Sequence, residues 1–190
     1  MVDLGNNRLK KFSNSGAYLT QFGSTGRGPG QFSYPTSVAI DGSGNLFVLD
    51  GYNARVQKFT STGGYLLQFG SAGSGTGQFG INPSNGDNSV AQALAIDASN
   101  HVWVADTYNN RVEEFDDNGN FLGEFGYGVV STPKGIAVDG WNARVEEFSG
   151  GGSFELQLGG GWPGGSGNGQ FGINPSPAQT GLTQGIVVSR

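Results

Sequence analysis

Residues 38–59 read VAIDGSGNLFVLDGYNARVQKF, and this stretch decides the fold. Two short apolar runs, VAI and LFVL, flank the loop DGSGN, whose residue types favour tight turns. A third run, RVQKF, follows the segment DGYNA and carries more polar residues. The stretch therefore predicts antiparallel strands at residues 38–41, 46–50 and 55–60, and the next turn leads to a fourth strand at residues 65–69.

The same pattern recurs along the chain, which indicates internal repeats. An Asp, an Asn and an Arg keep one spacing in four places: Asp3, Asn6 and Arg8; Asp50, Asn53 and Arg55; Asp106, Asn109 and Arg111; and Asp139, Asn142 and Arg144. A turn and a further apolar segment follow each of these places. The 36 glycines among 190 residues therefore mark many tight turns rather than a low-complexity chain.

The distribution of apolar residues within a unit predicts how the units assemble. The first two strands are almost continuously apolar, as expected for strands buried on both faces, whereas the last two carry Gln, Lys, Glu and Thr. A single four-stranded sheet cannot cover both of its own faces, so several sheets must stack on one another. The sequence therefore predicts an all-β fold, a β-propeller of four-stranded antiparallel blades, with about four blades in this chain.

Residues 35–59 and 92–115 closely resemble the NHL repeat. In that family a blade runs from a proline through a short apolar strand ending in Asp, a Gly-Asn turn and an apolar strand ending in Ala-Asp to the motif Asn-x-Arg-Val. The resemblance extends over nearly the whole chain. It implies an NHL-type β-propeller, which in this family usually has six blades.

We expect residues 1–190 to form a single propeller region. It divides into a partial unit at residues 1–37, units at 38–93, 94–135 and 136–185, and the start of a further unit at 186–190. The first unit lacks its first strand, and residues 186–190 match that strand alone. Two arrangements remain open: an arc of a six-bladed propeller that is cut short at both ends, or a small closed ring in which the two ends complete one blade.

The fourth unit is shorter than the others. Asp97 and Asp139 are 42 positions apart, whereas Arg111 and Arg144 are only 33 apart, so nine residues that correspond to 42–50 are missing. They include the whole second strand. Parallel neighbours need a crossover of about a dozen residues. The four residues 140–143 therefore allow only a hairpin, which predicts a three-stranded antiparallel fourth blade.

Composition argues against several classes of protein. The net charge is −5 and only ten Lys and Arg are scattered along the chain, so the basic patch of a nucleic-acid-binding protein is missing. No apolar run approaches the roughly 20 residues of a membrane helix, and without cysteine there are no disulfides. No targeting motif fixes the compartment, although a location outside the cytoplasm is slightly favoured.

Lactonases, streptogramin lyases and amidating lyases resemble this architecture, and they hold a metal ion near the central channel. This chain has one histidine, His101, at the turn position that matches Asn45, and we interpret it as a polar turn residue. Asp41, Asp97 and Asp139 each end a first strand. A carboxylate ring around a cation is one interpretation, and capping of each residue's own hairpin is the favoured one. We predict no catalytic residue, no metal ligand and no cofactor.

Two further sets of repeated residues are candidates for structure and for binding. We expect the pairs Asp50 and Arg55, Asp106 and Arg111, and Asp139 and Arg144 to be structural, because a binding site needs one constellation rather than one copy in every unit. The loops beside them carry the candidate binding surface: Tyr52, Asn53, Tyr108, Asn109, Trp141 and Asn142. The alternative is that these aromatic residues pack on the adjacent blade.

The resulting functional hypothesis is a non-catalytic binding or scaffold propeller, which presents its loops to a protein or another macromolecule. Self-association through open blade edges is a further possibility. One alternative is part of a lactonase-like or streptogramin-lyase-like enzyme whose metal ligands lie in missing blades. A second alternative is RNA binding, which is known for some animal NHL propellers and is disfavoured here by the acidic charge.

Overall fold

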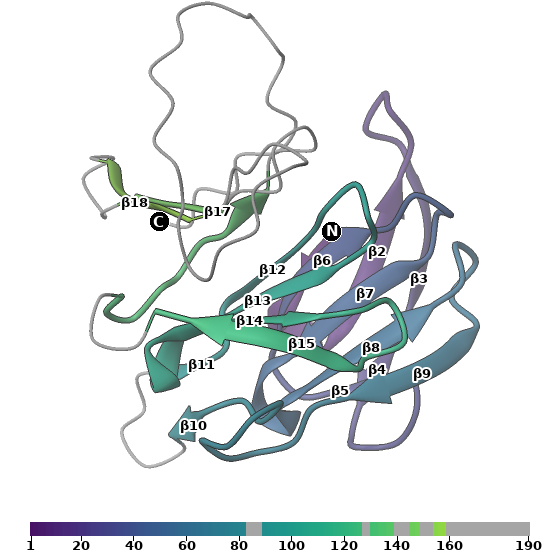
Figure 1. The fold of residues 1–190 in the computed structure, drawn as a ribbon. Helices are drawn as coiled ribbons and strands as arrows, with labels where there is room; N and C mark the ends of the chain where they lie inside the picture. Colours follow the sequence, from purple (N-terminus) through teal and green to yellow (C-terminus); the bar gives the residue numbers. More distant parts are fainter. Residues whose placement is uncertain (83–88, 127–129, 139–144, 149–153, 159–190) are drawn as a thin grey trace, which may run out of the picture.

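The computed structural model describes residues 1–82, 89–126, 130–138, 145–148 and 154–158 (Figure 1). Regular structure in these residues consists of β-strands and of three single-turn 3-10 helices: η1 (Leu4–Asn6), η2 (Gly51–Asn53) and η3 (Thr107–Asn109). No helix in this part of the chain is long and apolar enough to cross a membrane.

Two complete blades form the centre of the structure. Blade 2 has the strand order β6-β7-β8-β9 and blade 3 the order β12-β13-β14-β15, with every neighbouring pair antiparallel. Their strands are β6 (Pro35–Ile40), β7 (Leu46–Asp50), β8 (Arg55–Phe59), β9 (Tyr65–Phe69), β12 (Ala93–Ile96), β13 (Val102–Asp106), β14 (Arg111–Phe115) and β15 (Phe121–Phe125). The prediction of four-stranded antiparallel blades is therefore confirmed.

The first strand of blade 2 is longer than predicted. It begins at Pro35 rather than at Val38. Proline has no N–H to donate and is therefore tolerated at the first position of a strand. A register shift between Pro35 and Ser37 then brings the strand into regular pairing with β7.

Two three-stranded antiparallel sheets flank the complete blades. Blade 1 contains β1 (Val2–Asp3), β2 (Arg8–Phe12) and β3 (Tyr18–Phe22), and blade 4 contains β16 (Ala137–Val138), β17 (Val145–Phe148) and β18 (Phe154–Leu158). In blade 4 both neighbouring pairs are antiparallel, which confirms the predicted three-stranded blade. The predicted link at residues 140–143 and the strand at 186–190 lie outside the described residues.

Short strands also form in the connectors between blades. They are β4 (Ser24–Thr25), which pairs in parallel with β5 (Gln31–Phe32), and β10 (Ile81–Asn82), which pairs antiparallel with β11 (Ser89–Val90). The phenylalanine of the repeated GQF triplet, Phe32 or Phe79, is fully buried. The glycine-rich connectors are thus anchored to the blades by their aromatic residue.

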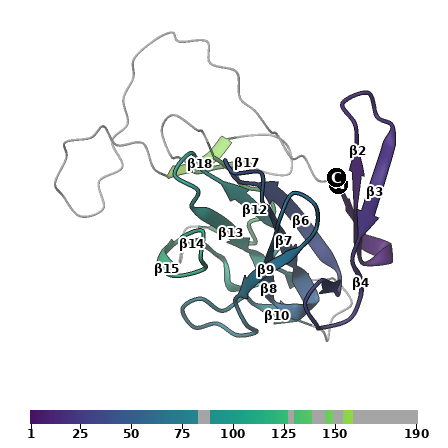
Figure 2. The ribbon, with the colours of Figure 1, turned by 90° about the vertical axis from the view of Figure 1, so that its right-hand side faces the viewer.

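The hydrophobic core lies between the blades, which stack in chain order (Figures 1 and 2). Val48 packs with residues of blade 1, whereas Phe47, which points to the opposite face of the same strand, packs with residues of blade 3. On the far face of blade 3, Trp103 and Val112 pack with Ile136. Each complete blade therefore buries both faces, as the apolar runs predicted.

The meander defines two ends of the stack. The loops between the first and second strands, residues 41–45 and 97–101, lie at what we call the hairpin end. Helices η2 and η3, which join the second and third strands, lie at the opposite end with the connectors, because β7 and β13 run from one end to the other. We call this opposite end the connector end.

Candidate functional site

The repeated Asp and Arg form a buried pair at the connector end of blade 2. Asp50 ends β7 and faces Arg55, which begins β8. The Arg55 Nε donates to Asp50 Oδ2 at 2.9 Å. Its remaining N–H groups donate to Gln68 Oε1 and to the carbonyls of residues 27, 28 and 31. Arg55 therefore fastens the connector to the blade and offers no free donor to a ligand.

Blade 3 repeats this arrangement with more negative charge. Arg111 pairs with Asp106 at 3.3 Å, and its NH2 nitrogen lies 2.9 Å from Glu113, where blade 2 has Gln57. Glu124 replaces Gln68 and lies 2.9 Å from the NH1 nitrogen of Arg111. Burial raises the pKa of Glu113 to about 7, against the opposing effect of the nearby Arg111. One guanidinium thus serves three carboxyl groups.

The two described asparagines of the candidate binding surface are occupied by internal hydrogen bonds. Asn53 Nδ2 donates to the carbonyl of Gly26 and to Asp50 Oδ2, at 2.8 Å each. Asn109 Nδ2 makes the equivalent bonds to Gly73 at 2.9 Å and to Asp106 at 2.7 Å. These side chains hold the connectors in place. Four other predicted residues lie outside the described residues: Asp139, Trp141, Asn142 and Arg144.

The two described tyrosines of that surface are both packed and partly open. Tyr52 stacks on Tyr34, with ring centroids 4.7 Å apart and an angle of 26° between the planes, and 37% of it remains exposed. Tyr108 lies over Gly80, where an added Cβ would come within 2.8 Å of the tyrosine, and 45% of it is exposed. Each tyrosine therefore covers a connector with one part of its surface and presents the rest to solvent.

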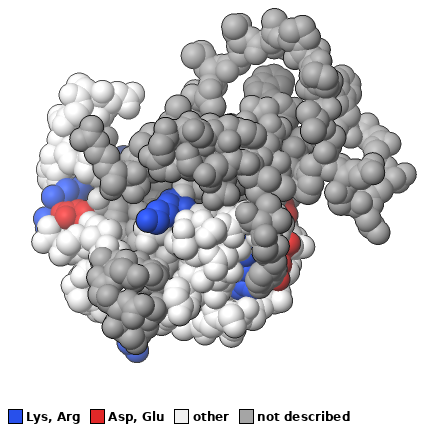
Figure 3. All heavy atoms as spheres, turned by 90° about the vertical axis from the view of Figure 1, so that its left-hand side faces the viewer, with Lys and Arg blue, Asp and Glu red and all other residues white. Residues whose placement is uncertain are grey.

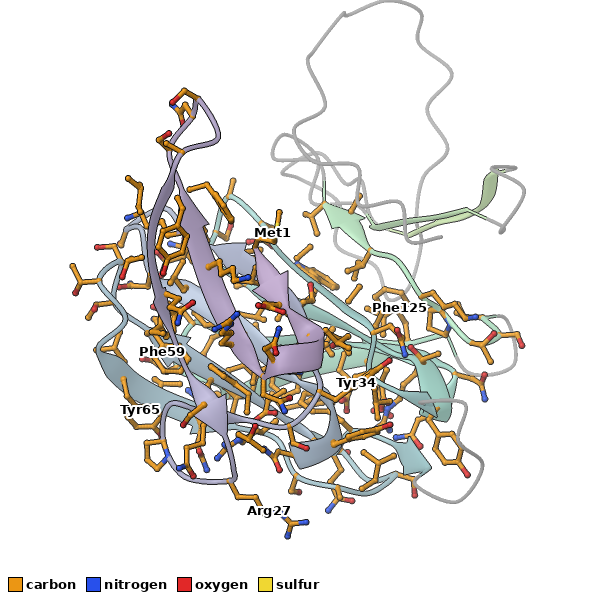
Figure 4. The ribbon with its side chains drawn as sticks, turned by 180° about the vertical axis from the view of Figure 1, so that it is seen from behind. Met1, Arg27, Tyr34, Phe59, Tyr65 and Phe125 are labelled. Atoms are coloured by element: carbon orange, nitrogen blue, oxygen red, sulfur yellow. The ribbon has the colours of Figure 1, made fainter. Side chains whose placement is uncertain are left out.

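A pocket of about 350 Å³ lies beside Tyr52 at the connector end, and we call it the Tyr52 pocket. Its lining includes Arg27, Asn53, Gln68 and Ser71. Arg27 is exposed and makes no ion pair with any residue that the structure describes. Figure 4 shows its side chain pointing away from the blades. The pocket thus combines an aromatic wall with a positive charge at its rim.

Sequence analysis did not identify Arg27 as part of a site. It lies in a glycine-rich connector that has no strand periodicity, and only the folding of that connector over β8 brings it to Tyr52. On the face seen in Figure 3, basic and acidic side chains are scattered among other residues and form no continuous basic area.

The hairpin end contains the two described aspartates that end a first strand. Asp41 Oδ1 accepts hydrogen bonds from the N–H groups of Ser43 at 2.9 Å and Asn45 at 2.8 Å. Asp97 Oδ1 accepts bonds of 2.8 Å from the corresponding N–H groups of Ser99 and His101. Each carboxylate caps its own hairpin, as the favoured interpretation stated.

His101 is more than a polar turn residue, because the structure brings it together with two carboxylates. Its Nδ1 lies 2.9 Å from Glu114 Oε1 and 3.3 Å from Asp97 Oδ2. Glu114 pairs with Trp103 across the ladder of β13 and β14. His101 lies two positions before Trp103, so the side chains of Glu114 and His101 lie on the same face of the sheet. That register was the available signal for this cluster. Burial also raises the pKa of Glu114.

The family model described as NHL repeat matches residues 32–59 and 89–115. No curated protein sequence matches the chain. Among solved structures, a streptogramin B lyase is similar, with 17% identity, a TM-score of 0.51 and coverage of 84% of this chain and 50% of that one. The virginiamycin B lyase of Staphylococcus aureus has 14% identity, a TM-score of 0.54 and coverage of 78% and 44%.

A gluconolactonase of Xanthomonas campestris is also similar, with 15% identity, a TM-score of 0.53 and coverage of 83% of this chain and 43% of that one. The chain spans about half the length of these solved structures. At such low identities the likeness establishes the β-propeller fold alone.

Proposed function

From the premise of a β-propeller fold with NHL repeats at residues 32–59 and 89–115, we propose that the chain is a non-catalytic module that binds a partner protein at the connector end. The single observation that carries this proposal is the Tyr52 pocket. A rigid scaffold of stacked sheets presents loops there, and loops on such scaffolds commonly carry binding functions.

The chemistry of the pocket indicates the kind of segment that it accepts. Tyrosine and arginine are enriched among the residues that dominate binding energy at protein interfaces. Tyr52 supplies a stiff ring that is already oriented by stacking on Tyr34, and Arg27 supplies an ion-pair donor at the rim. Two further polar lining residues, Asn53 and Arg55, donate hydrogen bonds to the connector. The fitting ligand is therefore a peptide segment with an acidic residue beside an apolar one.

This proposal predicts that a random peptide library displayed on phage yields binders to the purified chain, and that these peptides carry an acidic residue. Tyr52→Ala and Arg27→Ala should each weaken the binding of a selected peptide by at least about tenfold, which corresponds to about 1.4 kcal/mol. Isothermal titration calorimetry with the synthetic peptide measures the change.

Tyr65→Ala is the matched control, because Tyr65 lies on the outer strand β9 and is 39% exposed, close to the 37% of Tyr52. It should bind the peptide as the unaltered chain does. The proposal is wrong if no peptide is enriched, or if the selected peptides bind the Tyr52→Ala chain with unchanged affinity.

A catalytic function is the second candidate, because the similar solved structures include two lyases and a gluconolactonase. The described lining of the Tyr52 pocket contains no histidine and no carboxylate, so a catalytic metal ion in that pocket would need ligands from further blades. Incubation of the 190-residue chain with quinupristin or with gluconolactone tests it. Turnover that disappears in Tyr52→Ala would favour catalysis over simple binding.

A further inference from the structure

We propose that Asp97, His101 and Glu114 form a binding site for a divalent transition-metal ion, with zinc as the fitting ion, at the hairpin end of blade 3. One ligand atom from each of the three side chains can be chosen so that all of them lie within 4.8 Å of one another. The site is on the opposite end of the stack from the Tyr52 pocket and is independent of the proposed binding function.

The separations of the donor atoms suit a tetrahedral zinc ion. Zinc binds imidazole nitrogen and carboxylate oxygen at about 2.0–2.1 Å, so two of its tetrahedral ligands lie about 3.3 Å apart. The observed separations from the His101 Nδ1 are 3.3 Å to Asp97 Oδ2 and 2.9 Å to Glu114 Oε1. Small rotations of the side chains bring the three atoms around one ion, and the fourth position is left for water.

The surrounding hydrogen bonds hold two of the three ligands in place. Asp97 is buried and its Oδ1 is fixed by backbone N–H groups, while its Oδ2 accepts a bond of 3.1 Å from Trp103 Nε1. The backbone of His101 is tied to Asp97 in both directions, since each N–H bonds to the other residue. Such outer contacts orient metal ligands and increase metal affinity.

In blade 2 the position that corresponds to this site contains a positively charged side chain. In blade 2 the equivalent residues are Asp41, Asn45 and Lys58, in the same register. The Lys58 ammonium bonds to the carbonyl of Asp117 in blade 3 at 2.9 Å and lies 3.3 Å from Asp117 Oδ2. It also lies 3.9 Å from Asp41 Oδ2 and 4.9 Å from the centre of the Phe47 ring, which corresponds to Trp103. Blade 2 therefore places a built-in cation beside the capping aspartate.

Blade 3 has exchanged that cation for ligands. Glu114 replaces the lysine and His101 replaces the asparagine, so a carboxylate with an ammonium partner becomes two carboxylates with an imidazole. The aspartate and the hairpin are the same in both blades. A divalent ion bound in blade 3 would supply the positive charge that Lys58 supplies in blade 2. Imidazole favours zinc over magnesium, which prefers oxygen ligands alone.

Titration of the full chain with ZnCl₂, followed by isothermal calorimetry and by thermal unfolding, tests this proposal. We expect saturable binding of one ion per chain, a rise in the melting temperature with zinc concentration, and much weaker binding of MgCl₂. His101→Asn and Glu114→Gln should each lower the zinc affinity at least about a hundredfold, because even loss of an outer partner costs about 10–100-fold.

The converse variant uses the repeat as its own control. Asn45→His combined with Lys58→Glu copies the blade 3 ligands into blade 2, and the chain should then bind two zinc ions. A far-ultraviolet circular dichroism spectrum of each variant verifies that it is folded. The absence of saturable zinc binding overturns the proposal, as does binding that is unchanged in His101→Asn.

Discussion

Replacing Arg111 with alanine is expected to cost about 3–5 kcal/mol of stability, the range measured when one partner of a buried ion cluster is removed. Arg111 is fully buried and is the cation that faces Asp106, Glu113 and Glu124. Without it, the buried carboxyl groups of Asp106 and Glu113 and the partly exposed one of Glu124 lose the cation that they share. A typical domain has only about 5–15 kcal/mol to lose, so this change removes a large part of the free energy of unfolding and lowers the urea concentration at which the chain unfolds.

The loss has a second source in the connector. Arg111 donates to the backbone carbonyls of Ser74, Gly75 and Gln78, at distances between 2.6 and 3.1 Å. While the connector stays packed on the blade, water cannot easily reach these carbonyls to replace Arg111 as their donor. An unpaired buried acceptor costs about 1–3 kcal/mol. Detachment of residues 74–78 is therefore expected together with the loss of stability.

Urea unfolding of the Arg111→Ala chain, followed by tryptophan fluorescence, measures this effect. Arg8→Ala is the control, because Arg8 is the same repeat residue in blade 1 and pairs with Asp3 at 2.8 Å, but its side chain is 30% exposed. Exposed pairs contribute little, so the control should unfold close to the original urea concentration. Equal losses in the two variants would show that the burial of the blade 3 cluster is not the cause.

Much of the fold followed from the sequence because the repeats carry redundant information. Each unit has the same sequence pattern, so a strand that is ambiguous in one unit can be assigned from the others. The deletion in the fourth unit was also informative: a link of four residues permits only a hairpin, and the antiparallel pairing of β16 with β17 agrees with that argument. The strand directions in that blade were predicted from the length of the link rather than from residue preferences.

The sites were harder to predict, because they depend on which side chains meet between elements. Asn53 was assigned to the binding surface for its loop position, yet its amide is occupied by Asp50 and the carbonyl of Gly26. The exposed Arg27 was missed because no periodicity places a glycine-rich connector in space. His101 was judged by its turn alone, and its partner Glu114 enters only through the register of β13 and β14.

Replacing Glu113 with glutamine is expected to stabilise the chain at pH 8, although it removes a partner of Arg111. In blade 2 the same position is Gln57, whose Nε2 donates to the carbonyl of Gln31 at 2.8 Å and to Asp50 Oδ2 at 3.2 Å. Glu113 keeps the acceptor role of Gln57, since its Oε1 accepts the N–H of Gly77, but its buried Oε2 has no hydrogen-bond partner. As an anion it cannot supply the donor that the site requires, and glutamine can.

The pH dependence separates this effect from a change of packing. Burial raises the pKa of Glu113 from 4.5 to about 7, so the folded chain holds a proton there that the unfolded chain releases. The stability that this proton contributes is complete below about pH 4.5 and is lost as the pH rises through 7. The loss is at most about 3 kcal/mol, at about 1.4 kcal/mol for each unit of pKa difference.

The stabilisation by Glu113→Gln should therefore be largest at pH 8, about 1–3 kcal/mol, and should shrink toward zero as the pH falls to 4.5. Urea unfolding of both chains at several pH values between 4.5 and 8 measures the difference, in which titrating groups that do not interact with Glu113 cancel. Gln57→Glu in blade 2 should behave in the opposite sense, with its destabilisation greatest at pH 8. A difference that stays constant across this range would contradict the explanation, because an effect of shape alone does not depend on a proton.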